Sequence, residues 1–124
     1  MAGKNRAVAI TGIGIVSALG NSWPTFWNSC LDGRTVVDAV PDHWQKYYSA
    51  KSKYWSPLQC PDYSSIGLSR SVILSTDTAV LNALHAATEA VRHSACDMTN
   101  CEDRAGHYQL DSFDAYRCGV FIGT

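Results

Sequence analysis

Residues 7–20 have the sequence AVAITGIGIVSALG, in which an apolar strand is followed by a turn through Gly12 and Gly14. The strand is apolar on both faces, which is typical of a sheet covered by helices on both sides, as in α/β proteins. The glycines permit positive φ and let another backbone or a ligand come close. This stretch therefore predicts an α/β fold with a buried strand over residues 7–11.

Composition narrows the class of protein. The chain has 124 residues and a net charge of -1, which suits one modest domain and offers no excess of positive charge for a nucleic acid. Charged residues make up only 17%, below the roughly 25% of an average soluble domain, so we expect another subunit to cover part of the surface. We expect no membrane span and no secretory signal, and the five cysteines favour reduced thiols in the cytoplasm.

A first helix is predicted over residues 22–31, with Asn21 or Ser22 as its N-cap and Pro24 in its first turn. Gly33 suits the left-handed position that ends a helix. Apolar side chains recur at helical spacing, which predicts one buried face, made of Trp23, Phe26, Trp27, Cys30 and Leu31.

A second helix is predicted over about residues 71–94. Its many alanines make it slim, which allows a close approach to a sheet or another helix. Apolar residues that include Val80, Leu84 and Val91 lie along one side, and Asp77 falls on the same side. We therefore expect Asp77 to be a buried carboxylate that needs a partner.

The remaining segments show no helical period. Residues 44–63, from Trp44 to Tyr63, are aromatic with interleaved lysines, which indicates either a binding surface for a nucleic acid or carrier protein, or rings that pack on the body or a neighbour. We favour the packing interpretation. Residues 96–115 are polar and predict a surface connection, whereas residues 118–124 predict a second buried strand.

Two rival sites have partial support. A dinucleotide fingerprint needs a third glycine where Ser17 stands, and the helix begins well after Gly14. A zinc site could draw on His93, Cys96, Cys101 and His107, but the Cys-x4-Cys spacing is loose and no second cysteine pair supports it. A Ser-His-Asp triad has no nucleophile elbow in its favour. We expect no cofactor and no metal.

Three blocks resemble the β-ketoacyl synthases, the condensing enzymes of fatty-acid and polyketide assembly. They are residues 8–21, residues 68–71 leading into the alanine-rich helix, and residues 117–124, RCGVFIGT. The resemblance implies a thiolase-like αβαβα sandwich, of which residues 1–124 would form only the first part of the N-terminal half. Residues 71–75, SVILS, depart from the family's pattern.

The resemblance implies no catalytic residue in this chain, because the family's condensing Cys and two His lie further along. Ser94-Ala95-Cys96 is superficially similar to the motif around that cysteine, but Cys96 follows a helix C-terminus, where the dipole disfavours a thiolate. None of His43, His85, His93 and His107 matches a catalytic position. Two strands with unpaired edges cannot form a sound sheet alone, so we expect the remainder of the synthase on another chain.

Three functions stay open. The first is a β-ketoacyl-acyl carrier protein synthase, with a second ketosynthase subunit in a homo- or heterodimer and an acyl carrier protein as partners. The second is a chain-length factor, a non-catalytic homologue that pairs with an active ketosynthase. The third is an unrelated α/β binding module.

Overall fold

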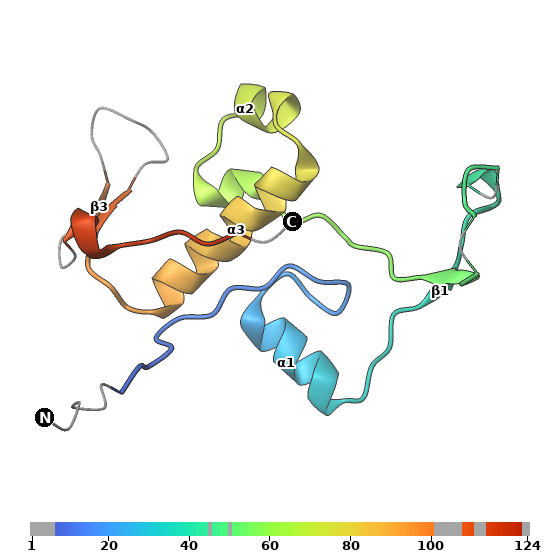
Figure 1. The fold of residues 1–124 in the computed structure, drawn as a ribbon, viewed down its shortest axis with the longest axis horizontal. Helices are drawn as coiled ribbons and strands as arrows, with labels where there is room; N and C mark the ends of the chain where they lie inside the picture. Colours follow the sequence, from blue (N-terminus) through green and yellow to red (C-terminus); the bar gives the residue numbers. More distant parts are fainter. Residues whose placement is uncertain (1–6, 45, 50, 101–107, 111–113, 123–124) are drawn as a thin grey trace, which may run out of the picture.

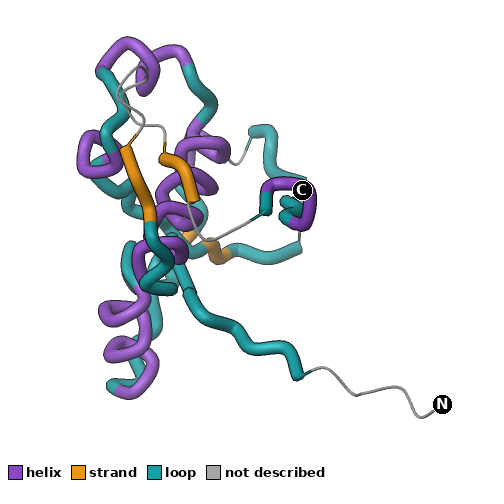
Figure 2. The backbone as a smooth tube through the Cα atoms, turned by 90° about the vertical axis from the view of Figure 1, so that its left-hand side faces the viewer, coloured by secondary structure: helices purple, strands orange, loops and turns teal. Residues whose placement is uncertain are grey.

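The computed structural model describes residues 7–44, 46–49, 51–100, 108–110 and 114–122. Helix α3 (Thr78–His93) lies at the centre, with α1 (Trp23–Leu31) and α2 (Arg70–Ser75) on opposite sides of it (Figure 1). The smaller elements are β1 (Asp38–Ala39), η1 (Asp42–Trp44), β2 (Tyr54–Trp55), η2 (Tyr63–Ile66), β3 (Met98–Asn100), β4 (Tyr108–Leu110) and η3 (Ala115–Arg117). The first described residues, from residue 7 onward, form a non-helical segment that extends away from the helices (Figure 2).

Helix α1 begins and ends as predicted. The Ser22 hydroxyl accepts a hydrogen bond from the Thr25 N–H, and Pro24 lies in the first turn. Gly33 follows the helix with φ +64°, a left-handed conformation that glycine adopts without steric strain because it has no Cβ. The predicted burial of its apolar face is wrong, because Trp27 is 52% and Leu31 69% exposed.

The predicted second helix is two helices. Helix α2 ends at Ser75, Thr76 has extended backbone angles, and α3 starts at Thr78. Asp77 is the N-cap of α3, where its exposed carboxylate accepts from the Ala79 N–H at 2.8 Å. The expectation of a buried Asp77 is therefore wrong, because an aspartate side chain satisfies the free N–H groups at a helix start.

The packed face of α3 also differs from the expected one. Leu81 is only 3% exposed, whereas Val80 and Leu84 of the predicted apolar side are 50% and 43% exposed. Within the part of the chain that the structure describes, no helix is long and apolar enough to cross a membrane.

Tyr63 and Ile66 of η2 are buried together with Leu81 of α3. The Tyr63 hydroxyl donates to the Asn82 side-chain oxygen at 2.8 Å, which ties η2 to α3. Burial, reinforced by the Cys60 thiol, raises the pKa of the Tyr63 phenol to about 12. Gly67 ends η2 with φ +81° and turns the chain toward α2.

The described strands form two small antiparallel ladders, β1 with β2 and β3 with β4. The β3–β4 ladder lies inside the segment predicted as a plain surface connection. The strands predicted over residues 7–11 and 118–124 are wrong as strands: residues 7–11 and 118–122 pair with no described segment, and residues 123–124 lie outside the described ranges. A strand needs a neighbour to satisfy its backbone groups, and here none is supplied.

The glycines of the opening stretch lie against the backbone of α3. A Cβ on Gly14 would collide with the Ala86 carbonyl, and one on Gly12 would collide with the Ala90 carbonyl. The alanine-rich helix thus makes a close approach, as predicted, but its partner is a segment outside any strand or helix, where a sheet or another helix was expected. The glycines serve close packing between two parts of the chain.

We predict that Gly14→Ala destabilises this joint by about 1–3 kcal/mol, because helix backbone cannot yield to the new methyl group. The measurement is the urea midpoint of the complete chain, with any polypeptide that co-purifies, followed by helical circular dichroism. Gly33→Asn is the matched control, since its Cβ meets open space and asparagine tolerates positive φ. Equal midpoints for the two variants would contradict the packing role.

We predict that one tyrosine ionises about two pH units later than an exposed tyrosine, whose pKa is near 10. Between pH 10 and 12 the folded chain keeps a proton that the unfolded chain has lost, so stability falls as pH rises through this window. An absorbance titration of phenolate checks this. Tyr63→Phe should remove the late step, whereas Tyr116→Phe, at a fully exposed ring, should remove an ordinary one.

Candidate functional site

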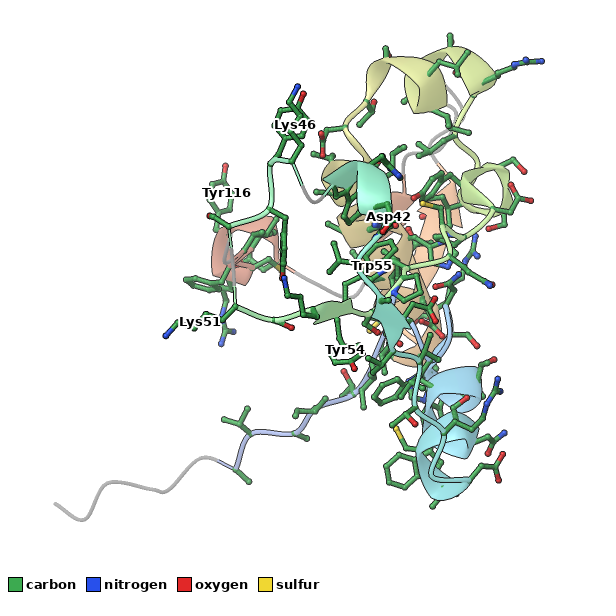
Figure 3. All side chains as sticks on the ribbon, turned by 90° about the vertical axis from the view of Figure 1, so that its right-hand side faces the viewer. Asp42, Lys46, Lys51, Tyr54, Trp55 and Tyr116 are labelled. Atoms are coloured by element: carbon green, nitrogen blue, oxygen red, sulfur yellow. The ribbon has the colours of Figure 1, made fainter. Side chains whose placement is uncertain are left out.

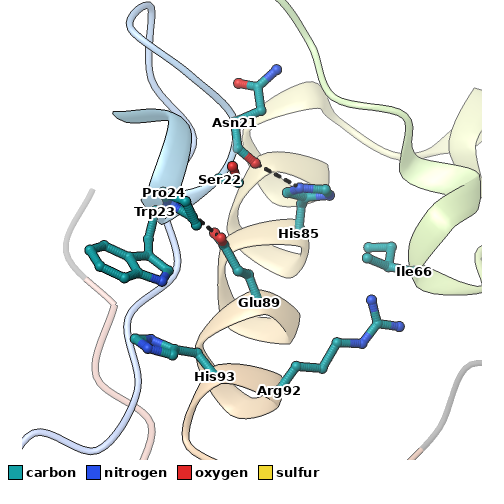
Figure 4. Close-up of a pocket in the computed structure, with 9 residues that line it drawn as sticks. All are labelled: Asn21, Ser22, Trp23, Pro24, Ile66, His85, Glu89, Arg92 and His93. Atoms are coloured by element: carbon teal, nitrogen blue, oxygen red, sulfur yellow. Dashed lines mark hydrogen bonds between the residues drawn. The ribbon is translucent and has the colours of Figure 1, made fainter. Parts of the chain in front are cut away.

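A cleft of about 410 Å³ lies between the start of α1 and one side of α3. Figure 4 shows residues 21–24 facing three side chains that α3 presents at successive turns, His85, Glu89 and His93. Arg92 of α3 and Ile66 of η2 line its other end. Because these three side chains are four residues apart, they lie in one column on the helix surface.

Glu89 is bonded at both carboxylate oxygens. One oxygen accepts from the Trp23 N–H at 2.7 Å, and the other accepts from the Ile15 N–H at 2.8 Å. The Trp23 N–H is one of the first donors of α1, which no carbonyl within that helix can satisfy. Glu89 therefore holds the start of α1 and the glycine-rich segment to the same turn of α3.

The two histidines, one helical turn before and one turn after Glu89, make further contacts between α3 and the preceding segments. His93 Nδ1 accepts from the Ile13 N–H at 3.1 Å, and its ring stacks on Trp23 with centroids 5.3 Å apart. His85 Nε2 lies 3.3 Å from the Asn21 carbonyl oxygen. Since a carbonyl only accepts, His85 donates from Nε2, and the proton of His93 belongs on its Nε2.

Among the residues that the structure describes, two buried acceptors of the cleft find no hydrogen-bond partner. They are His85 Nδ1 and Asn21 Oδ1. The Asn21 amide orientation follows from its other bond, because Nδ2 donates to the Gln59 carbonyl at 2.7 Å. Both atoms would therefore need a donor, such as a water molecule or an N–H group.

The contacts that His85, Glu89 and His93 make with the backbone of residues 13–23 form a structural clamp, which holds this segment against α3. Glu89 has each oxygen engaged by a backbone N–H group, so its carboxylate holds two segments of the chain to α3. The dinucleotide interpretation fails on the same contacts, since Glu89 occupies the start of α1 and α3 backbone covers the glycines. No space remains there for a pyrophosphate.

The structure separates the other predicted candidates. Cys96 follows the end of α3, as predicted, and its sulfur accepts from the Ser94 hydroxyl at 2.9 Å. His93 is engaged with Ile13, while Cys101 and His107 lie outside the described residues. Across the described ranges, no three His, Cys, Asp or Glu side chains are grouped so as to hold a metal ion.

Sequence reasoning missed the column of His85, Glu89 and His93. The available signal was their spacing of four on a helix that otherwise consists largely of small and apolar residues. Attention to the apolar period alone gave the wrong packed side, because polar groups hold this helix to its neighbours.

A second hollow lies beside the clamp. It has a volume of about 470 Å³ and an almost wholly apolar lining, contributed by Ile13, Ile15, Trp23, Phe26 and Trp27. The alternate residues Ile13 and Ile15 thus face α1, whereas Gly12 and Gly14 face α3. Trp23, Phe26 and Trp27 belong to the predicted apolar face of α1, so this face lines the hollow. The hollow is open to the surface.

We predict that Glu89→Gln exposes one of the two clamped N–H groups, because an amide offers one acceptor and turns a donor toward the other N–H. Leaving that group unsatisfied costs about 1–3 kcal/mol, which corresponds to hydrogen exchange roughly 5–150 times faster at Ile15 or Trp23. Asp38→Asn, on an exposed residue of β1, should leave both rates unchanged. Equal protection in both variants would contradict the clamp.

Comparisons with known proteins agree with the resemblance. The N-terminal domain of β-ketoacyl synthases matches residues 5–124. The Streptomyces halstedii protein named polyketide beta-ketoacyl synthase 1 is 29% identical over 121 residues, which is 97% of this chain and 25% of that protein. The chain therefore spans about a quarter of this relative's length. No solved structure matches the chain.

The family match covers nearly the whole chain, including the glycine-rich segment, α1 and α3. The clamp is thus built from residues that all fall within the matched domain. The chain belongs to the β-ketoacyl synthase family, and its residues 5–124 match the N-terminal domain of that family.

Proposed function

We propose that this chain is the scaffold part of a β-ketoacyl-acyl carrier protein synthase in fatty-acid or polyketide biosynthesis. In the proposed reaction, a cysteine thiol first attacks an acyl thioester, takes over the acyl group and releases the thiol that had carried it. A malonyl-carrier thioester then loses CO₂, and the resulting enolate attacks the acyl thioester, forms the carbon–carbon bond and releases the thiol. Family membership and the name of the Streptomyces relative support this proposal.

The observation that carries the proposal is the exposure of large apolar side chains on several faces of the described chain. Val8 is 94% exposed and Phe121 97%, and both lie in segments predicted as buried strands. The outer face of α1 and the Val80 side of α3 are exposed as well. Exposed apolar area of this extent is typical of a surface that another protein part covers.

We propose that the remainder of the synthase, on another polypeptide, covers these surfaces and supplies the condensing Cys and the two His. The full assembly would contain this chain, its remainder, a second ketosynthase subunit and a transiently bound acyl carrier protein. The described cysteines, Cys30, Cys60, Cys96 and Cys118, are free, which favours a reducing, cytoplasmic compartment.

The alternative is a chain-length factor that partners an active ketosynthase. Residues 70–75 favour it, because they form the separate helix α2 and depart from the family's usual pattern after Arg70. The two functions differ at the nucleophile position, which the resemblance places outside residues 1–124: a Cys there supports the enzyme, and a Gln or another inert residue supports the chain-length factor.

The test is purification of the complete chain from its own cells, followed by intact mass and N-terminal sequencing of every stable component. We expect a second polypeptide that carries the rest of the ketosynthase sequence, including the nucleophile position. The assembly should release CO₂ from malonyl-carrier protein, and replacing the nucleophilic Cys of the second polypeptide by Ala should abolish condensation. A chain that unfolds cooperatively as a monomer, and that a nucleotide stabilises, would overturn the proposal in favour of a binding module.

A further inference from the structure

His93 is the point at which α3 holds the outer end of the opening segment. Its Nδ1 accepts from the Ile13 N–H at 3.1 Å, and within the described residues no hydrogen bond lies nearer to the start of the chain. Ile15, two residues further on, is held separately by Glu89. The His93 contact is therefore the hydrogen bond that ties residues 7–13 to α3.

The contact with Ile13 requires a neutral imidazole. A neutral ring has one nitrogen that accepts and one that donates, whereas a protonated ring has two donors. Histidine is the side chain that ordinarily changes its charge between pH 5 and 8. Protonation of His93 would turn an N–H toward the Ile13 N–H, and two donors that face each other cannot form a hydrogen bond. The contact must then open.

Trp23 offers the protonated ring a place of its own. The His93 ring is stacked on the indole of Trp23, with centroids 5.3 Å apart and planes inclined by 15°. The face of an indole attracts a positive charge, so this stack becomes more favourable when the ring is protonated. His93 is also exposed, which allows a proton to reach it from solvent. The side chain thus has two stable arrangements, one for each charge state.

Two charged groups of α3 line the cleft beside His93. Glu89 lies one turn before it, and Arg92 is the preceding residue (Figure 4). A carboxylate favours a charged ring and a guanidinium disfavours it, so the two act in opposite directions. Residues 7–24, which supply the opening segment and the first turn of α1, contain no charged side chain. The opening segment therefore offers a protonated His93 no carboxylate in exchange for the lost N–H contact.

His85 does not share this sensitivity. Its Nε2 donates to the Asn21 carbonyl, and this nitrogen carries a proton in both charge states. The charged group that influences it from η2 is Asp62. Hydrogen bonds from Ser64 hold the pKa of the Asp62 carboxyl below its usual range, and the charge of a protonated His85 adds to this effect. The His85 contact therefore survives protonation, with a carboxylate at hand.

We propose that His93 is a proton-operated latch: its neutral ring holds Ile13 against α3, and its protonated ring stays on Trp23 and releases residues 7–13. Ile15 remains bound to Glu89, because carboxylates keep their charge over the range in which histidine titrates. The exposed apolar start of the chain is thus held in one conformation at neutral pH and freed in acid. The latch does not depend on the proposed function, because every group that it needs lies in this chain.

The test follows amide hydrogen exchange in the complete chain, with any polypeptide that co-purifies, at pH 8 and pH 5.5. Each rate is compared with that of an unstructured peptide at the same pH, which removes the intrinsic pH dependence of exchange. We expect the protection of the Ile13 N–H to fall roughly 2- to 12-fold at the lower pH, as the loss of one exposed hydrogen bond implies. The N–H groups of Ile15 and Trp23 should keep their protection.

Two amide variants separate the roles of the histidines. His93→Asn places a carbonyl oxygen where Nδ1 accepts, and this oxygen does not titrate, so Ile13 should be equally protected at both pH values. His85→Gln keeps an N–H donor near the position of Nε2. It should leave the pH response of Ile13 as it is in the parent chain.

His43 supplies a matched control outside the cleft. Its ring packs edge-on against Trp44 with centroids 5.9 Å apart, and Trp44 meets Trp55 edge to face at 4.7 Å, so the packing interpretation is confirmed for these rings. Figure 3 shows Asp42, which precedes His43, and Trp55 of β2. His43→Asn removes a titrating ring from this group and should leave the pH response of Ile13 unchanged.

Three results would overturn the latch: no pH response in the parent chain, a response that persists in His93→Asn, or one that disappears in His43→Asn. Equal loss of protection at Ile13, Ile15 and Trp23 would also overturn it, because that pattern reports opening of the whole clamp. The proposed function would stand after any of these results.

Discussion

The fold depends on one carboxylate. Glu89 bonds the first free N–H of α1 and the Ile15 N–H of the glycine-rich segment, so three parts of the chain meet at one turn of α3. Hydrogen bonds to a charged acceptor are about twice as strong as neutral ones, and removal of the acceptor leaves two donors without partners. His93 and His85 repeat the arrangement one turn away on either side. The chain is thus held by polar contacts to backbone, with little apolar burial.

That balance explains why the large apolar side chains are exposed. The polar column occupies the side of α3 that faces the rest of the chain, so Val80 and Leu84 point outward. Similarly, Gly12 and Gly14 take the α3 side of the opening segment, which leaves Ile13 and Ile15 for the hollow beside α1. The clamp orients these apolar faces and leaves them available for the larger assembly that we propose.

The sequence predicted those features of the fold that depend on residues close together in the chain. The Ser22 cap, the end of α1 at Gly33 and the close approach of the alanine-rich helix depend on neighbouring residues, and all three are confirmed. Asp77 was misplaced because a helical period takes no account of an aspartate's preference for a helix start. The strands predicted at 7–11 and 118–124 were wrong at residues 7–11 and 118–122, because a strand depends on partners distant in sequence. The clamp was missed because its three residues are polar, and the search followed apolar spacing.

The contact of Gly12 and Gly14 with Ala90 and Ala86 also sets a length scale. Two residues of extended chain span about 6.6–6.8 Å, and four residues of helix rise about 6 Å, so alternate glycines match successive turns of α3. A slip by one residue would bring Ile13 or Ile15 against the helix backbone, where only glycine fits. The helix therefore fixes the register of the opening segment before any neighbouring strand pairs with it. A polypeptide that adds strands here would inherit its alignment from α3.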